Sequence, residues 1–366
     1  MTRAPAQNIA QLDALTGIRG VAAWFVVLYH MRVSMVALVP PGVIAVFGQG
    51  YLAVDLFFML SGFVIWLNYA ARFRERGLAE LPHFWWRRFA RIWPLHAAIL
   101  SALVLFALVL LATGREDASY PFAELPLHFL LVQNWGFTSE LNWNNPAWSI
   151  STEFAAYLAF PFIVLALPWE RFRARALLGF AVLLCVLLHL LFAARGETSI
   201  GEEITRLGLW RCLGEFAMGM VLCRMWQELG ERRGAALVAF AAGIALLGGG
   251  LLLGLPQTAF VPACFAALLL ALALDRGPVA RLLGSKPLRR LGDVSYSTYL
   301  VHFPLFTIFK ILFVDETLQL SWWDVAGFLG LVLASSLLFY RLLERPAQRW
   351  LNAHPPKLVA RAPFAS

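Results

Sequence analysis

The chain has 366 residues, of which 60% are hydrophobic and 14% are charged, and its net charge is +8. A typical soluble domain carries about 25% charged residues, so this composition excludes a water-soluble protein and indicates a multi-pass membrane protein. The positive residues follow alternate apolar segments instead of forming one patch, so the charge argues for neither a nucleic-acid partner nor an acidic partner.

Ten apolar segments of about 20 residues are long enough to cross the hydrocarbon core of a bilayer as helices. In chain order they are residues 18–38, 51–70, 92–112, 147–167, 176–194, 207–226, 235–254, 258–274, 292–314 and 322–343. The prediction is an all-α, polytopic membrane protein of about ten transmembrane helices, built as a single membrane-embedded domain over residues 1–366. The apolar stretch 125–135 is too short to span, and we expect it to lie in the interface or to re-enter beside the pore.

Arginine and lysine cluster after every second apolar segment. The clusters lie at residues 72–91, 171–175, 224–233, 276–290 and 345–361. Because short cytoplasmic loops accumulate these residues, both termini are predicted to be cytoplasmic. The first segment lacks the basic region, short apolar core and cleavage site of a signal peptide, so we expect it to be retained.

Two ionisable residues share nearly one face of the first predicted helix. Arg19 precedes His30 by eleven positions, which is about three turns plus ~20° of rotation and about 16 Å of helix length. An ionisable residue inside a bilayer is costly and usually faces a protein interior or a water-filled cavity. His30 is therefore a candidate functional residue. The alternative is a histidine that is simply hydrogen-bonded within the bundle.

Several ionisable residues are predicted to lie in the outer half of the membrane, namely His30, Asp55, Glu153, Arg211 and Glu215. Their convergence suggests one hydrated site between helices. A carboxylate that binds one imidazole nitrogen fixes the tautomer and stabilises the imidazolium, so Asp55 is the candidate that orients His30. The alternative is an ion pair between Asp55 and Arg211 that holds helices together.

Gly62 follows Asp55 by seven positions and lies about 20° around the same helix. A residue without a side chain lets another backbone or a ligand approach closely. We expect such an approach below the carboxylate of Asp55.

Ser149 and Glu153 share a helix face at i and i+4, directly after a break at Asn145 and Pro146. They could contact an acceptor that arrives from outside. Glu153 could equally pair with Arg211. Arg211 and Glu215 are also spaced at i and i+4 and could satisfy one another without a ligand.

A polar stripe runs along the ninth predicted helix. It consists of Ser295, Tyr299 and His302, at i, i+4 and i+7. The stripe could line a substrate path, with His302 as a substrate-binding candidate. Interhelical hydrogen bonding is the alternative for all three residues.

Aromatic and basic residues alternate just before the third predicted helix. The default interpretation is an interfacial belt with cytoplasmic positive charge. Arg88 and Arg91 lie three positions apart, however, so both could face one anionic group, as phosphate recognition favours. With Arg19 at the same membrane edge, they form a possible phosphate collar.

Taken together, these motifs resemble the acyltransferase 3 family of integral membrane acyltransferases. The resemblance covers nearly the whole chain, and each motif is weak alone while the ordered set is specific. The motifs are Arg19 with His30, the run Val54 to Phe63, Arg88 with Arg91, the run Pro146 to Phe154, the run Ser295 to His302, and Glu344-Arg345-Pro346.

This resemblance implies an enzyme that takes an acyl group, commonly acetyl, from cytoplasmic acyl-CoA to a hydroxyl, commonly on an envelope or exported glycan. By motif, His30 is the catalytic histidine, and Arg19, Arg88 and Arg91 belong to donor-side motifs. The expected partners are acyl-CoA, a carbohydrate or other hydroxyl acceptor and the lipid bilayer, with no metal. Some relatives carry a further SGNH-type esterase domain, and we expect this chain to be a stand-alone form in the bacterial cytoplasmic (inner) membrane.

The mechanistic hypothesis is that Arg19, Arg88 and Arg91 hold the CoA phosphates while the pantetheine arm extends toward His30. Held by Asp55, His30 would deprotonate the acceptor hydroxyl, and a covalent acyl-histidine is also conceivable. The competing interpretation is a multi-pass transporter whose buried charges bind a solute or protons. A third is a non-catalytic membrane scaffold.

Overall fold

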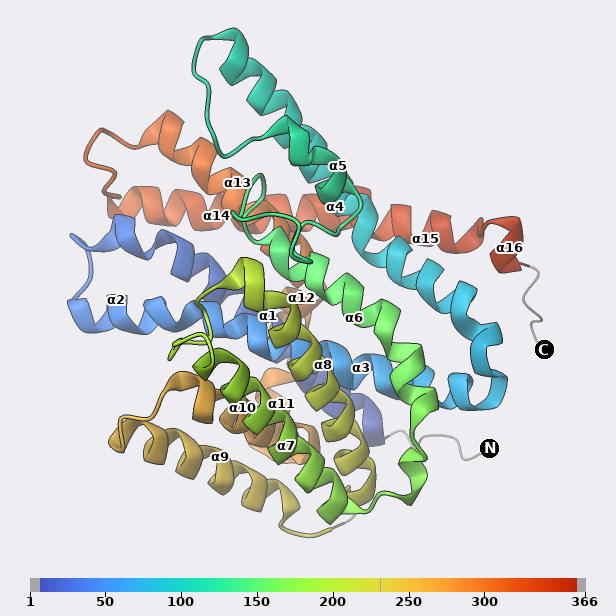
Figure 1. Ribbon diagram of the computed structural model, residues 1–366. Coiled ribbons are helices and arrows are strands. Elements are labelled where there is room, and N and C mark those ends of the chain that lie inside the picture. Colours follow the sequence, from blue (N-terminus) through green and yellow to red (C-terminus); the bar gives the residue numbers. More distant parts are fainter. Residues whose placement is uncertain (1–6, 231, 361–366) are drawn as a thin grey trace. The chain divides into compact units, whose positions relative to one another are not determined.

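The computed structural model describes residues 7–230 and 232–360, which form helices and connecting loops without a strand (Figure 1). The predicted all-α membrane architecture is confirmed. Each predicted span overlaps one long helix, although the first helix ends at Met31 and not at residue 38, where the sequence predicts its end. These helices are α1 (Gln7–Met31), α3 (Ala53–Arg76), α4 (Leu81–Ala112), α6 (Ala147–Ala166), α7 (Ala174–Ala193), α8 (Ile204–Leu229), α9 (Ala235–Leu252), α10 (Gln257–Leu274), α13 (Ser295–Phe313) and α14 (Trp322–Phe339).

Short helical pieces fill many of the connections. They are η1 (Arg32–Met35), α2 (Pro41–Gly48), η2 (Gln49–Leu52), η3 (Gly77–Glu80), η4 (Phe122–Glu124), α5 (Leu125–Phe129), η5 (Trp169–Arg171), α11 (Pro278–Leu283), α12 (Lys286–Asp293), η6 (Tyr340–Glu344), α15 (Arg345–Ala353) and α16 (Lys357–Ala360). The sequence did not predict α2, which begins at Pro41, where the fixed φ of proline suits a first helical position.

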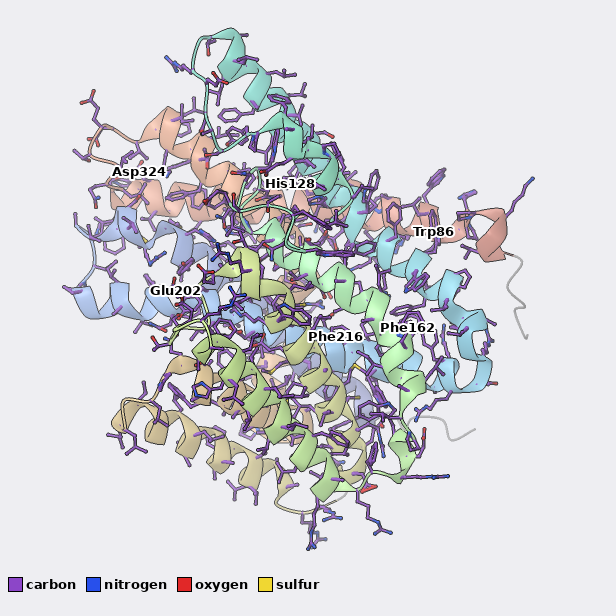
Figure 2. The ribbon with its side chains drawn as sticks, in the orientation of Figure 1. Trp86, His128, Phe162, Glu202, Phe216 and Asp324 are labelled. Atoms are coloured by element: carbon purple, nitrogen blue, oxygen red, sulfur yellow. The ribbon has the colours of Figure 1, made fainter. Side chains whose placement is uncertain are left out.

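Within the described residues, eight helical segments are long and apolar enough to cross a membrane, and one of them, Pro41–Ala112, contains both α3 and α4. α8 is not among the eight, and it carries the buried charges Arg211 and Glu215. Large apolar side chains such as Phe162, which is 52% exposed, point outward from the helices and suit a lipid environment (Figure 2). The count of ten spans and the cytoplasmic termini stay predictions.

The chain divides into two compact units. The first comprises the described parts of Met1–Val21, Val54–Glu80 and Ala156–Asp293, and the second those of Ala22–Ala53, Leu81–Ala155 and Val294–Ser366. The predicted single domain over residues 1–366 therefore stays a prediction.

In the first unit, α9 packs on α10, and α10 also packs on α7 and α8. Glycines bring α3 and α8 together. A methyl group at Gly62 would overlap the backbone oxygen of Phe216, and one at Gly219 would overlap that of Met59. The backbone approach expected at Gly62 is thus confirmed, and the approaching element is α8.

In the second unit, an apolar core joins the end of α1 to α13 and α14. Val27 and Met31 of α1 pack with Phe306 and Phe309 of α13 and with Phe328 of α14, all buried. His30 lies between Val27 and Met31 in the sequence, so this core fixes the position of the last turn of α1.

The short apolar stretch after α4 also belongs to the second unit, where it forms α5. Nε2 of His96 donates to the carbonyl of His128 at 2.9 Å, and Nε1 of Trp93 donates to the carbonyl of Phe129 at 2.9 Å. These bonds tie α5, which carries His128 (Figure 2), to α4. Whether this stretch lies in the interface or re-enters stays a prediction.

Candidate active site

His30 lies in the last turn of α1 and is partly exposed. Its ring centre lies 5.1 Å from that of His302, at an interplanar angle of 46°. Phe303 and Tyr29 meet the same ring edge to face, at 5.1 Å and 5.0 Å. The structure therefore brings together His30, the predicted catalytic histidine, and His302, a predicted substrate-binding residue. Aromatic rings pack against His30 on its other sides.

His302 on α13 is 1% exposed. Its Nδ1 lies 3.2 Å from the carbonyl oxygen of Thr298, and a carbonyl can only accept, so Nδ1 carries the proton. Nε2 is then a bare acceptor. Within the part of the chain that the structure describes, this buried Nε2 has no hydrogen-bond partner.

Ser149 at the start of α6 is tied to Tyr299 on α13, with 2.8 Å between the two hydroxyl oxygens. Both hydroxyls also reach the carbonyl of Pro146, at 3.0 Å and 3.1 Å. The alternative interpretation of Tyr299, an interhelical hydrogen bond, is thus confirmed. Glu153 lies one turn beyond Ser149 on α6 and is partly exposed. Acceptor binding by Ser149 and Glu153 stays a prediction.

Asp55 and Arg211 form a bidentate ion pair between α3 and α8 in the first unit. Nε and Nη2 of Arg211 donate to the two carboxylate oxygens at 2.7 Å and 2.6 Å. The two side chains are 0% and 1% exposed. The ion pair that was the alternative for Asp55 is therefore present, and an orienting role toward His30 stays a prediction.

Glu215 lies one turn beyond Arg211 on α8 and is also buried. Its oxygens accept no hydrogen bond from Arg211. The helix-internal pair that the i and i+4 spacing suggested is therefore not formed. Arg211 instead directs Nε and Nη2 to the two oxygens of Asp55.

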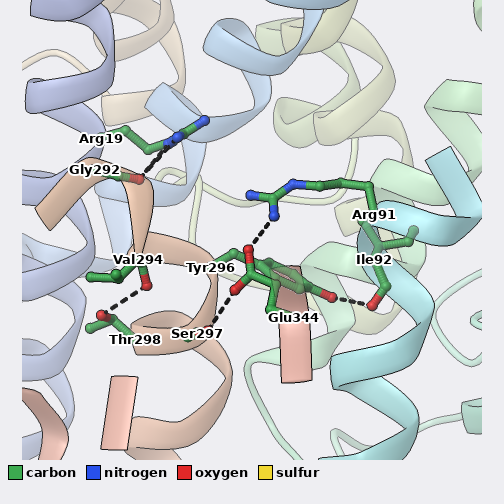
Figure 3. Close-up of polar contacts among 9 residues, drawn as sticks. All are labelled: Arg19, Arg91, Ile92, Gly292, Val294, Tyr296, Ser297, Thr298 and Glu344. Carbon is green, nitrogen blue, oxygen red and sulfur yellow. Dashed lines mark hydrogen bonds and ion pairs between the residues drawn. The ribbon is translucent and has the colours of Figure 1, made fainter. Parts of the chain in front are cut away.

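Arg19 belongs to the first unit and donates to the carbonyl of Gly292 through Nε at 3.3 Å and Nη2 at 2.9 Å. Gly292 lies near the C-terminal end of α12, where unpaired carbonyls and the helix dipole favour a cation. Figure 3 shows this contact. Donor binding by Arg19 stays a prediction.

Arg91 on α4, in the second unit, forms an ion pair with Glu344. Glu344 is 2% exposed and lies in η6, a π-helical turn. The hydroxyl of Ser297 donates to the other carboxylate oxygen at 2.5 Å, as Figure 3 shows. Arg91 thus already has a carboxylate partner, while Arg88 lies one turn earlier and is partly exposed.

Two residues of this region were not predicted as site residues. Glu344 stands in the Glu-Arg-Pro motif at the end of the last span, and that motif was the available signal. Arg32 follows His30 by two positions and stacks on Tyr29, with its guanidinium carbon 3.9 Å from the ring centre. A cation at the predicted outer end of a span departs from the positive-inside pattern, which was the signal for Arg32.

Among residues 7–230 and 232–360, no group of three or more histidine, cysteine, aspartate or glutamate side chains is arranged to hold a metal ion. The arrangement can instead support proton transfer by His30 beside a second, buried imidazole.

Comparison with known proteins gives one family match, an acyltransferase domain that covers residues 12–341. The chain is 31% identical to the acyltransferase MdmB of Streptomyces mycarofaciens, over 97% of this chain and 96% of that protein. It is 22% identical to the peptidoglycan O-acetyltransferase OatA of Listeria monocytogenes, over 95% of this chain and 58% of that protein. For the O-acetyltransferase OatA of Staphylococcus aureus the identity is 22%, over 92% and 57%. No solved structure matches the chain.

Proposed function

Because the chain belongs to the acyltransferase 3 family and is a multi-pass membrane acyltransferase, we propose that it moves an acyl group from cytoplasmic acyl-CoA to an acceptor hydroxyl. Acetyl is the proposed group, since the OatA relatives are named O-acetyltransferases. The proposed acceptor is an envelope or exported glycan, since one relative is named for peptidoglycan. The proposed location is the bacterial inner membrane.

One observation carries this proposal. The partly exposed His30 packs against His302 at the end of α1, in a chain that the acyltransferase family covers almost completely. A partly exposed imidazole can accept the proton of a hydroxyl during attack and return it to a leaving group. This is the chemistry that transfer between a thioester and a hydroxyl requires.

In the proposed reaction, His30 accepts the proton of the acceptor hydroxyl as its oxygen attacks the thioester carbon. The tetrahedral intermediate then collapses, the bond between carbon and sulfur breaks, and the new ester forms. The imidazolium returns the proton to the CoA thiolate, so atoms and charge balance. General-base assistance of this kind contributes about 10² to 10⁴ in rate.

The donor side of the proposal rests on Arg19, Arg88 and Arg91. Guanidinium groups are suited to phosphate because they offer several N–H donors in a planar fork. Arg19 and His30 both lie on the continuous helix α1. We expect Arg19, Arg88 and Arg91 to contact the CoA phosphates, and we expect the ion pair with Glu344 to fix the direction of the Arg91 guanidinium.

The test uses the purified protein in proteoliposomes with labelled acetyl-CoA and a glycan extract from the envelope. The wild type should transfer label to the extract and release CoA. His30→Ala should lose transfer by about a hundredfold or more, with an unchanged thermal unfolding midpoint. Transfer at the wild-type rate by a folded His30→Ala protein would disprove the role of His30.

A matched control is His354→Ala, because His354 directly follows α15, is exposed and contacts Trp350. This variant should transfer label at the wild-type rate. Solute flux without release of CoA from the wild type would instead indicate transport.

A further inference from the structure

The buried acceptor nitrogen of His302 has no role in the reaction above. A buried polar atom that lacks a hydrogen bond destabilises the folded protein. Most buried polar atoms have a hydrogen-bond partner, so an unpaired one beside a proposed active site calls for an explanation such as a bound molecule. Nε2 of His302 is this kind of atom, and it belongs to the ring packed against His30.

A hydrogen bond within α13 determines which kind of group Nε2 of His302 can bind. Because Nδ1 gives its proton to the carbonyl of Thr298, Nε2 holds a lone pair directed away from that turn of α13. A lone pair repels a developing oxyanion, so neutral His302 does not stabilise the tetrahedral intermediate through this atom. Nε2 requires an O–H or N–H donor.

The attacked hydroxyl is not that donor. It has a single proton, and the proposed reaction delivers this proton to His30. Tyr299 is close, with 5.9 Å between the ring centres, but its hydroxyl is engaged with Ser149 and the carbonyl of Pro146. A second donor on the acceptor molecule, next to the attacked hydroxyl, meets the requirement.

We propose that His302 is a specificity-determining residue that selects acceptors with two neighbouring donor groups, as in a vicinal diol or an amino alcohol. One hydroxyl gives its proton to His30 and becomes acylated, while its neighbour donates a hydrogen bond to Nε2 of His302. The inference rests on the proposed function and deepens it, because it states which chemical class of acceptor the site takes. A mono-alcohol leaves Nε2 unpaired and is acylated more slowly.

The experiment compares two small acceptors that differ by one hydroxyl, propane-1,2-diol and propan-1-ol. Purified protein in proteoliposomes receives acetyl-CoA with both alcohols at equal concentration, and the two esters are quantified by mass spectrometry. The wild type should acylate the diol about ten to a hundred times faster, since sites built to pair a polar group reject analogues that lack it.

Two substitutions at position 302 separate the role of Nε2 from a role in folding. His302→Phe removes the lone pair and keeps an aromatic ring, so the ratio of the two esters should fall close to one while transfer continues. His302→Gln places an amide oxygen near the position of Nε2 and should keep part of the preference.

The matched control is His96→Phe. His96 is equally buried in the same unit and also has an unpaired ring nitrogen, but its ring is bonded to the α5 segment through His128. This variant should keep the wild-type ratio.

Three results would overturn the inference: a wild-type ratio near one, a ratio in His302→Phe equal to that of the wild type, or loss of both esters in His302→Phe. The last result would mean that His302 acts through His30 and not on the acceptor. Loss of both esters in His30→Ala tests the proposed function separately, because the ratio is measured only in proteins that transfer.

Discussion

Two buried polar clusters, one in each unit, are organised differently: the ion pair of Asp55 with Arg211 in the first, and His30 with His302 in the second. In the first unit, Arg211 faces both oxygens of Asp55 and the pair is sealed from solvent. In the second unit, His30 is partly exposed and its neighbour His302 keeps one nitrogen unpaired. Both clusters place ionisable residues within helices that are otherwise largely apolar. The ion pair has therefore satisfied both oxygens of Asp55, whereas the proposed active site keeps an imidazole nitrogen that can still accept a hydrogen bond.

The largest effect on stability should come from breaking the buried ion pair between Asp55 and Arg211. Arg211→Met leaves Asp55 buried without a partner and should lower the free energy of unfolding by about 3–5 kcal/mol, whereas the double variant Asp55→Leu with Arg211→Met should recover most of it. Thermal unfolding in detergent measures both. We also expect the double variant to retain acyl transfer. A stable double variant without transfer would instead favour the orienting role of Asp55 toward His30.

The second effect concerns pH and the docking of α5. Burial and the neighbouring His96 lower the pKa of His128 to about 4, against about 6.5 when unfolded. Between these two pKa values, His128 is protonated in the unfolded chain but neutral in the folded protein. Stability from neutral His128 is present above about pH 6.5 and is lost as the pH falls toward 4, by up to about 3 kcal/mol.

Between pH 7 and pH 4, the unfolding midpoint of the wild type should fall relative to that of His128→Leu, which lacks the titrating group. His354→Leu is the control, because His354 is exposed. A constant gap between wild type and His128→Leu over this range would contradict the prediction.

A third effect should appear where a buried carboxylate holds an arginine. Glu344→Gln weakens the bonds from Arg91 and Ser297 and should cost about 1.5–3 kcal/mol, the range for hydrogen bonds to charged groups. Since Arg91 would lose its fixed direction, KM for acetyl-CoA should rise while KM for the acceptor stays. Equal changes in both KM values would show that Glu344 has no selective link to the donor.

The smallest effect should follow from Ser149→Ala. The hydroxyl of Ser149 bonds to Tyr299, which keeps its second contact with the carbonyl of Pro146. The loss should be about 1 kcal/mol of unfolding free energy. A loss of acceptor binding that exceeds this modest change in stability would support the predicted contact of Ser149 with the acceptor.

The helices could be predicted because span length and hydropathy are local properties. Which polar side chains of different helices pair with one another could not be predicted. The sequence offered Arg211 three carboxylates, Asp55, Glu153 and Glu215, and it pairs with Asp55, 156 positions away. Arg91 pairs with Glu344 across 253 positions. Spacing shows which side chains share a face of one helix, but the packing of separate helices decides which face meets which.

The ring of His302 illustrates a second limit. The sequence places His302 on a polar stripe, yet its tautomer depends on a single bond to Thr298. The aromatic and basic segment before the third predicted span similarly turned out to be the first part of α4, which begins at Leu81. Polar residues that continue a helix beyond the membrane carry no hydropathy signal.

The π-helical turn at Tyr340–Glu344 can be understood as a helix with one residue inserted. A π turn accommodates the extra residue in a widened ring of hydrogen bonds. Deleting one residue within the turn would restore an ordinary helix and rotate everything beyond it by about 100°. Glu344 would then face away from Arg91 while every amino acid of the ion pair was still present. In this part of the chain, gain or loss of a single codon has more consequence than most substitutions.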